Sequence, residues 1–223
     1  MPNKLIEAIN ISKSYKQGDI NINVLTNFSM TVNKGEFLAI TGSSGSGKTT
    51  LLNILGLIDN YDSGYLKYFN KDISKASENQ RDKLRLNHIG FVYQSSNLFD
   101  DFSATENVAL PLLLLGNSKK ESYIKSEDIL NRFGLSKRLK HTPKDLSSGE
   151  QQRVAIARSL IANPDIVIAD EPTGNLDKKT SSDVFEYFMK YTQESNCAVV
   201  MATHNLELAS LSGKRLDLGI KNE

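Results

Sequence analysis

A stretch of glycine and serine that ends in lysine and threonine constrains the fold of this chain more than any other segment. Gly42–Thr49, with the sequence GSSGSGKT, matches the pattern G-x-x-x-x-G-K-[ST] of a phosphate-binding loop. The apolar run Phe37–Ile40 before it predicts a buried parallel strand, and Thr50–Leu55 after it predicts a helix with one apolar face. In such a turn, glycines allow backbone N–H groups to surround phosphate oxygens at the N-terminus of the helix.

The pattern also assigns chemistry to single positions in this loop. Lys48 is expected to reach the β- and γ-phosphates, and the Thr49 hydroxyl is expected to ligate Mg²⁺. The alternative is a surface turn with an unrelated lysine. It is disfavoured because every position of the pattern is filled and the flanking strand and helix are both present. The sequence therefore predicts binding of a nucleoside triphosphate through Gly42, Ser43, Ser44, Gly45, Ser46, Gly47, Lys48, Thr49 and Thr50.

The composition argues against several other classes of function. The 27 basic and 26 acidic side chains give a net charge of +1 without a long run of one sign, which argues against a nucleic-acid-binding surface. The single cysteine, Cys197, excludes an internal disulfide, and three scattered histidines give no zinc site. The longest apolar stretch, Val108–Leu115, is far shorter than the ~20 residues that cross a bilayer. No apolar signal region follows the first residues, so we expect a soluble chain.

The first part of the chain is predicted to form a small antiparallel sheet that leads into a parallel core. Strand-like runs joined by short turns cover Leu5–Tyr15 and Val24–Val32, and Tyr65–Phe69 is expected to add a third strand. The charged segment Asp72–Leu86 is predicted to be helical. His88–Gln94 is apolar and β-branched enough for a core strand.

The second part of the chain is predicted to alternate helices and strands. Residues 95–144 are expected to be a helical insertion, with helices that start at Thr105 and cover Glu121–Phe133. Helices are then predicted at Gln151–Ala162 and Ser181–Tyr191. Strands are predicted at Asp165–Glu171, Cys197–His204 and Arg215–Ile220. This alternation predicts an α/β fold with a parallel sheet and a ligand site at the carboxyl ends of its strands.

Polar side chains end three of the predicted core strands. Asp170 and Glu171 end one strand, so the first carboxylate can ligate Mg²⁺ and the second can polarise an attacking water. Two such acids would cost stability unless a cation met them. His204 can position the water or the γ-phosphate, and Gln94 ends the third strand. A solvated acid pair and a structural histidine are the alternatives, which a phosphate loop on a neighbouring strand disfavours.

A further motif, LSSGEQQR at Leu146–Arg153, together with DEPTGNLD at Asp170–Asp177, completes the pattern of a known family. The chain resembles the nucleotide-binding subunits of ABC transporters over essentially its whole length. The resemblance implies a P-loop NTPase with a RecA-like parallel sheet core, an N-terminal antiparallel β subdomain and an inserted α-helical subdomain. It implies one ABC ATPase domain over 1–223, with the core near 1–94 and 163–223 and the helical subdomain near 95–162.

The resemblance also assigns roles to single residues. It makes Glu171 the catalytic glutamate and His204 the switch histidine. It implies that Mg²⁺ is held by Thr49, Gln94 and Asp170, and that Gln94 also touches the transmembrane subunits. The remaining matches are Tyr15, as the aromatic residue that stacks on adenine, and Asp177, in the D-loop. The signature is matched by Ser147, Ser148, Gly149 and Glu150.

One residue departs from the family pattern. The family signature has glycine at the position of Ser148, and a Cβ there would crowd the backbone and hinder a left-handed φ. We therefore expect an effect of Ser148 on the tightness of the ATP-bound assembly. In the family the signature approaches the γ-phosphate of the opposite subunit, so the resemblance implies an ATP-dependent homodimer.

Within the family, the chain looks most like the ATPases of bacterial lipoprotein-releasing systems. The resemblance is carried by Phe102–Leu113, Gly174–Asp177 and Thr203–Ala209. It implies ATP, Mg²⁺ and integral membrane permease subunits as partners, with lipoprotein as indirect cargo. The implied location is the cytoplasmic face of the bacterial inner membrane. The ATPases of macrolide or peptide efflux pumps and of the division-associated complex are the alternatives.

Two readings from other classes are disfavoured. A soluble ABC ATPase of DNA repair or ribosome rescue usually carries two ATPase modules or long coiled-coil insertions, which do not fit in 223 residues. A scaffold that binds but does not hydrolyse nucleotide is expected to lack the acid at 171 or the histidine at 204. By the same resemblance, Leu98, Phe99 and Phe102 are expected to line a groove for the membrane subunits.

Overall fold

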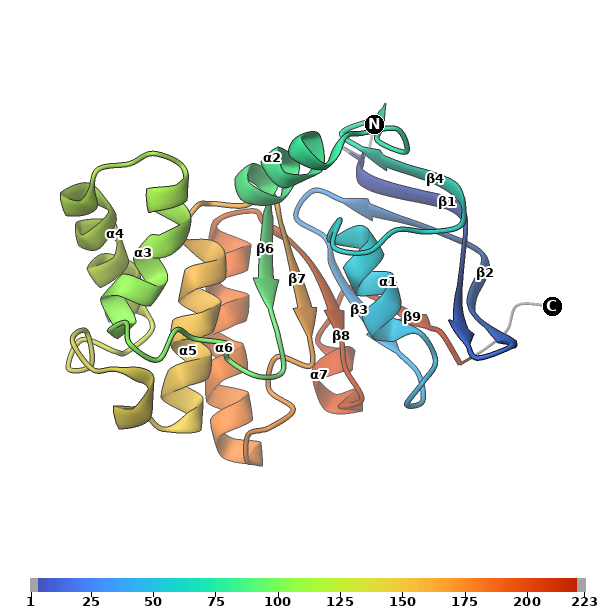
Figure 1. Cartoon of the computed structure of the whole chain (residues 1–223). Coiled ribbons are helices and arrows are strands. Elements are labelled where there is room, and N and C mark those ends of the chain that lie inside the picture. The colour runs from blue at the N-terminus through green and yellow to red at the C-terminus, as the bar shows by residue number, and fades with distance from the viewer. Residues whose placement is uncertain (1–3, 220–223) are drawn as a thin grey trace.

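The computed structural model describes residues 4–219, and residues 1–3 and 220–223 lie outside the described part. An antiparallel sheet, a parallel sheet and a group of helices lie side by side across the molecule (Figure 1).

The antiparallel sheet has the strand order β2-β1-β4-β5. Its first two strands form a long hairpin that closes at Gly18, where φ is +60°. Both strands reach further toward this turn than their patterns predict, because Gln17 still pairs with Ile20. The predicted antiparallel sheet is confirmed, with strands β1 Lys4–Gln17, β2 Ile20–Asn33, β4 Ser63–Tyr68 and β5 Lys71–Asp72.

The parallel sheet has the strand order β6-β7-β8-β3-β9, and every neighbouring pair in it is parallel. Its strands are β3 Phe37–Thr41, β6 Ile89–Val92, β7 Ile166–Asp170, β8 Ala198–Ala202 and β9 Lys214–Asp217. The α/β fold with a parallel core is therefore confirmed. All five strands point the same way, so their carboxyl ends meet at the lower edge of the molecule in Figure 1.

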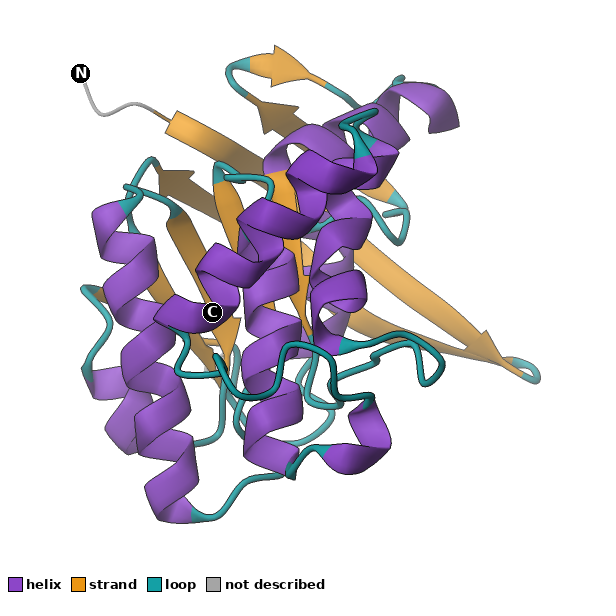
Figure 2. Ribbon diagram, turned by 90° about the vertical axis from the view of Figure 1, so that its left-hand side faces the viewer, coloured by secondary structure: helices purple, strands orange, loops and turns teal. Residues whose placement is uncertain are grey.

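Each face of the parallel sheet is covered by its own hydrophobic cluster. On one face Leu38 and Ile40 pack with the antiparallel sheet and with α1 Lys48–Leu55. On the other face Val199 and Met201 pack with helices, which stand in front of the sheet in Figure 2. Alternate residues of one strand thus enter opposite clusters, as expected for a sheet that is buried on both sides.

The helical segment is joined to the sheet by one helix. α5 Ser148–Leu160 packs against α3 Ala104–Leu114 and α4 Lys119–Arg132, and also against β6 and α6 Lys178–Glu194. It is preceded by a short 3₁₀ helix, η1 Pro143–Asp145, and α7 Leu206–Ser210 follows β8. The predicted helices from Thr105 and over Glu121–Phe133 are confirmed within a few residues.

The structure corrects several predicted boundaries. α2 Glu78–His88 starts later than predicted, because Asp72 closes a turn with the backbone N–H of Ser74 and Ser77 caps the helix in a capping box with Gln80. His88 ends this helix and does not begin the strand, and its Nδ1 lies 2.8 Å from Asp165. The last strand ends at Asp217, and Ile220, where it was predicted to end, lies outside the described residues.

Cys197 precedes β8 and is buried at 5% exposure. Burial raises the pKa of its thiol to about 12. A thiol with such a pKa is unreactive at neutral pH, so the side chain acts as a small core residue. Separately, no helix within residues 4–219 combines the length and apolar character that a membrane crossing requires.

A close approach between β6 and α5 gives a stability prediction. A Cβ on Gly90 would lie 2.3 Å from the backbone oxygen of Ser159, so Gly90→Ala must push strand and helix apart. We expect a loss of about 1–3 kcal/mol in the free energy of unfolding and a melting temperature lower by roughly 2–4 °C per kcal/mol. Thermal unfolding followed by circular dichroism measures this shift.

The matched control is Gly213→Ala, whose Cβ would have the backbone oxygen of Phe37 as its nearest neighbour, at 4.0 Å. It is expected to melt within about 1 °C of the parent. Equal melting temperatures for the two variants would show that β6 and α5 are not packed as closely as described.

Candidate functional site

The phosphate-binding loop runs from β3 to α1 at the carboxyl edge of the parallel sheet (Figure 1). Gly42 has φ of +150° and Gly47, the N-cap of α1, has φ of +94°. A Cβ on Gly47 would lie 2.8 Å from Cγ1 of Val24, so both the backbone conformation and the packing exclude a larger residue there. The turn therefore has the backbone that the sequence pattern requires.

The Lys48 side chain lies back across this loop. Its Nζ donates to the backbone oxygens of Gly42 and Ser43, both at 2.9 Å, and the residue is only 9% exposed. The ammonium group is thereby held at the loop, where phosphate oxygens can replace the two carbonyl groups as its partners.

A hydrogen bond joins the loop to the end of β7. The Thr49 hydroxyl donates to Oδ2 of Asp170 at 2.8 Å. Burial raises the pKa of Asp170 above its ordinary value, and the adjacent Glu171 adds to this, against the opposite effect of the Thr49 hydrogen bond. A carboxylate in this situation is favoured by a nearby cation, which stabilises its charged form.

Glu171 and His204 form a second pair at the same edge. His204 Nδ1 lies 2.8 Å from Oε2 of Glu171; Glu171 directly follows β7, and His204 lies two residues after the end of β8. Glu171 has φ of +46°, in the left-handed region that non-glycine residues rarely enter. Its backbone N–H donates to Ala202 at 2.9 Å and its carbonyl accepts from Gly174 at 2.9 Å. These two bonds hold the backbone in a strained conformation of the kind that is common at functional sites.

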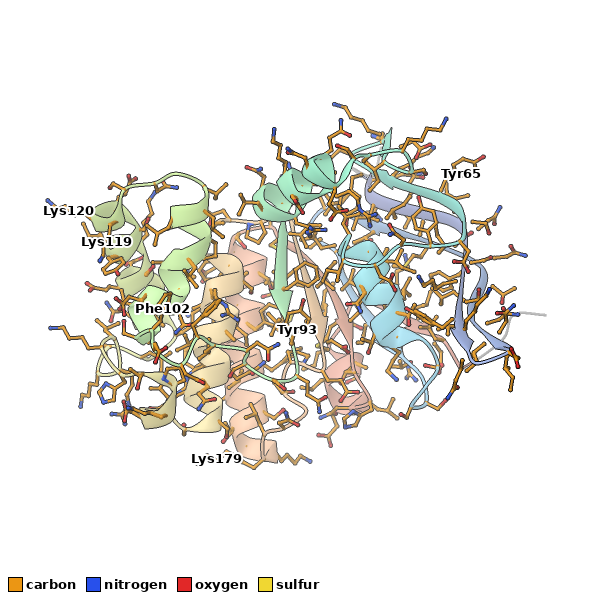
Figure 3. All side chains as sticks on the ribbon, in the orientation of Figure 1. Tyr65, Tyr93, Phe102, Lys119, Lys120 and Lys179 are labelled. Carbon is orange, nitrogen blue, oxygen red and sulfur yellow. The ribbon has the colours of Figure 1, made fainter. Side chains whose placement is uncertain are left out.

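Gln94 follows β6 at this edge, directly after Tyr93, which is labelled in Figure 3. Its side-chain amide donates to Asn175 Oδ1 at 3.0 Å, and the Asn175 amide donates back to the Gln94 carbonyl at 3.2 Å. Gln94 is thus tied to the loop that follows Glu171.

One pocket, about 580 Å³ in volume, unites residues from both sheets. Tyr15 and Val24 of the antiparallel sheet line one part of it, and the phosphate loop, Glu171 and His204 line the rest. The volume lies within the range of small-molecule sites. The complete lining is Tyr15, Val24, Gly42, Ser44, Gly45, Gly47, Lys48, Thr49, Thr50, Glu171 and His204.

The signature residues lie on a different element from this pocket. Ser147 caps α5 and forms a capping box with Glu150, whose carboxylate also pairs with Arg138 at 2.7 Å. Asp177 caps α6, whose first turn is marked by Lys179 in Figure 3. Ser147, Ser148, Gly149, Glu150 and Asp177 do not line the pocket that Lys48 and Tyr15 share.

Ser148, the residue that departs from the family pattern, has a helical backbone conformation. Ser148 is the first residue of α5 and is not among the residues with positive φ. A Cβ is therefore compatible with this helical backbone, and the expected hindrance of a left-handed φ does not arise in this chain.

Two polar partners of site residues were missed in the sequence. Asn175 exchanges hydrogen bonds with Gln94, and Asp59 accepts from the Tyr15 hydroxyl at 2.6 Å. Nothing in the local pattern marks either residue, because each acts on a partner that is distant in sequence.

The oxygen donors at the edge fit a magnesium ion. A hydroxyl and a carboxylate oxygen meet in the Thr49–Asp170 hydrogen bond, and Gln94 follows β6 at the same edge of the sheet. Within residues 4–219 there is no cluster of three His, Cys, Asp or Glu that could hold a metal ion by itself. This agrees with Mg²⁺ chemistry at nucleotide sites, where one or two carboxylates act together with phosphate oxygens and waters.

Comparison with known proteins places the chain in a family. The ABC transporter family model matches residues 25–174. The lipoprotein-releasing system ATP-binding protein LolD of Rickettsia bellii is 49% identical over 209 residues, which is 94% of this chain and 92% of that protein. LolD of Rickettsia felis is 48% identical over 224 residues, covering 100% of this chain and 99% of that protein.

A solved structure supports the same assignment. The ATP-binding cassette MJ0796, in a dimeric post-hydrolysis state bound to ADP and Pi, superposes with a TM-score of 0.89 at 36% identity. The match covers 98% of this chain and 97% of that one. By the family model, the relatives and the fold together, this chain is an ATPase that belongs to the ABC transporter family.

Proposed function

We propose that this chain is the ATP-hydrolysing subunit of a membrane system that releases lipoproteins from the inner membrane toward the outer membrane. The observation that carries the ATPase is the pocket shared by Lys48, Thr49, Glu171 and His204, with Asp170 bonded to Thr49. The cargo is supported by the two LolD relatives, which are 48–49% identical over nearly the whole chain. The proposed place of action is the cytoplasmic face of the inner membrane, as a peripheral subunit.

The proposed roles follow from the contacts. Lys48 exchanges its two carbonyl partners for β- and γ-phosphate oxygens, and Tyr15 stacks on the adenine at the other end of the pocket. Thr49, Asp170 and Gln94 would hold Mg²⁺, which supplies positive charge to the phosphate oxygens. Glu171 orients the attacking water and accepts its proton, while His204 fixes the glutamate through Oε2.

The proposed working unit is a homodimer. The phosphate loop and the signature lie on separate parts of one chain, and the capped N-terminus of α5 presents Ser147 and Ser148 at the surface. A helix N-terminus favours an anion such as a γ-phosphate. A second copy would bring its α5 to the pocket of the first, and the dimeric MJ0796 cassette supports this arrangement.

The proposed contact with the membrane subunits lies beside the segment after Gln94. Phe99 and Phe102 are 56% and 38% exposed, and their ring centroids lie 5.5 Å apart. Phe102 is labelled in Figure 3. The Asn107 side chain donates to the backbone oxygens of both residues and fixes this turn. Leu98 packs partly against the core cluster and also lines an adjoining hollow of about 530 Å³. Exposed aromatic pairs beside a hollow are typical of docking sites.

We also propose the division of the chain into two mechanical parts. The core near 1–94 and 163–223 would carry the phosphate loop. The helical part near 95–162 would carry both the signature and the turn that contains Phe99 and Phe102, here called the docking turn. α5 lies in the helical part and contacts β6 and α6 of the core, so a movement of the membrane subunits would reach the second nucleotide through this helix.

The function is tested with the chain purified together with its membrane subunits and reconstituted in proteoliposomes with lipoprotein. Lys48→Ala is expected to lower ATP hydrolysis and ATP-driven release of lipoprotein by at least about tenfold, because charge-assisted bonds to phosphate are lost. Lys34→Ala, at an exposed turn before β3, is the matched control and keeps both activities. Export of a macrolide or peptide without lipoprotein release would instead support the efflux alternative.

Glu171→Gln separates binding from chemistry. It keeps the shape of the side chain but removes the carboxylate that takes the proton, so ATP turnover is expected to fall about 100-fold or more. The variant should elute as a dimer in size-exclusion chromatography with Mg-ATP. The control is Glu207→Gln, an exposed carboxylate paired with Lys178 at 3.2 Å. Normal turnover in the Glu171 variant would exclude the glutamate as the general base.

Phe99→Ala with Phe102→Ala tests the docking turn. Both rings are exposed, so the double variant is expected to keep the melting temperature and ATP binding of the parent but to lose co-purification of the membrane subunits. Leu114→Ala with Ile124→Ala removes comparably exposed side chains from α3 and α4 as a control. Co-purification at the parent level by the phenylalanine variant would place the docking site elsewhere.

A further inference from the structure

The hydroxyl of Tyr15 has a fixed partner outside the nucleotide pocket. It donates to Oδ2 of Asp59 at 2.6 Å, while the ring lines the pocket beside Val24 and Thr50. Tyr15 is 41% exposed, so packing alone does not determine where its ring lies. The hydrogen bond from its hydroxyl to Asp59 therefore contributes much of what fixes the position of the ring.

Asp59 is itself held from the other side. Its Oδ1 pairs with Lys13 Nζ at 3.1 Å and accepts the backbone N–H of Asn60 at 2.7 Å. Lys13 Nζ also donates to the carbonyl of Asn60 at 2.7 Å and lies 4.8 Å from the centroid of the Tyr15 ring. Lys13 and Asp59 do not line the pocket, so they support the ring without facing the nucleotide.

The protonation states agree with this arrangement. Burial raises the pKa of Asp59, but hydrogen bonds from Tyr15 and Lys13 outweigh it and hold that pKa below its ordinary value. Burial and the hydrogen bond to Asp59 raise the pKa of Tyr15. At neutral pH the carboxylate is therefore charged and the phenol keeps the proton that it donates.

We propose that Asp59 is a positioning residue for nucleotide binding, which holds the Tyr15 ring at the base end of the pocket with Lys13 as its counter-ion. This rests on the proposed function, in which Tyr15 stacks on the adenine. Asp59 lies shortly after α1, the helix that follows the phosphate loop. Its hydrogen bond to Tyr15 therefore connects the ring at the base end of the pocket to the helix at the phosphate end. The Tyr15 hydroxyl donates its one proton to Asp59, so it does not donate to the edge of the base, and the ring face is left for stacking.

The main competing explanation is that Asp59 only fastens its loop to β1. The structure provides a matched control for this, because Asp62 in the same loop accepts from the backbone N–H and the hydroxyl of Ser14, both at 2.7 Å. Asp62 fastens the loop to the same strand, but within residues 4–219 its hydrogen bonds go to that strand and none reaches the Tyr15 ring.

The experiment measures binding of MgADP to the full chain by calorimetry, because ADP is not hydrolysed. Asp59→Ala is expected to raise the dissociation constant about threefold to tenfold, the effect of losing a typical intramolecular hydrogen bond, because Asp59 acts on the nucleotide only through the Tyr15 ring. The KM for ATP should rise by a similar factor while kcat stays within about twofold. Inhibition of the ATPase by inorganic tripolyphosphate, which has no base, should be unchanged.

Three further variants make the result specific. Asp62→Ala should leave MgADP binding within about twofold of the parent, and Asp59→Asn, which can still accept from Tyr15, should recover part of the affinity. Tyr15→Phe should weaken binding, and adding Asp59→Ala to it should cost little more, because both changes break the same bond. Circular dichroism melting identifies any variant that does not fold.

The possible outcomes separate this inference from the proposed function. Tyr15→Ala is expected to weaken MgADP binding about fivefold or more, as for a lost base-stacking partner. If Tyr15→Ala has no effect, the adenine role of Tyr15 is wrong. If Tyr15→Ala weakens binding but Asp59→Ala does not, or if Asp62→Ala is equally harmful, Asp59 is not a positioning residue. Additive effects of Tyr15→Phe and Asp59→Ala would lead to the same conclusion.

Discussion

The hydrogen bond between the Thr49 hydroxyl and the Asp170 carboxylate connects the start of α1, which follows β3 and the phosphate loop, to the end of β7, and these two strands are not neighbours in the sheet. β8 lies between β3 and β7, and the parallel register sets Ala202 level with both Ile40 and Asp170. The three strands therefore end side by side, which places the phosphate loop within reach of the acids after β7 and of His204 after β8. A slip of one residue in β7 would move Asp170 to the opposite face of the sheet and break this connection.

That register is held by the burial of both faces of the sheet. Neighbouring residues of each central strand enter different clusters, one shared with the antiparallel sheet and one shared with the helices. The antiparallel sheet thus has two tasks: it covers one face of the core, and it carries Tyr15 to the pocket. The helical side likewise covers the other face through α5 and presents the signature at the start of the same helix.

Those parts of the fold and site that depend on local patterns could be predicted from the sequence. Strand and helix periodicity revealed both sheets, and the phosphate loop and the strand-end acids fell where their motifs placed them. The start of α2 was missed because the capping box at Ser77 outweighed the helical character of the preceding residues. The partners of Gln94 and Tyr15 were missed because they lie 81 and 44 positions away, where no local pattern reports a contact.

The left-handed backbone at Glu171 has a consequence for how such a chain changes over generations. A non-glycine residue in this region carries a conformational cost on the order of 1–3 kcal/mol, which glycine would relieve. A mutation to glycine at this position would remove the carboxylate and at the same time ease the backbone. Thermodynamics alone thus favours a more stable, inactive chain, and only selection for turnover keeps the glutamate in place.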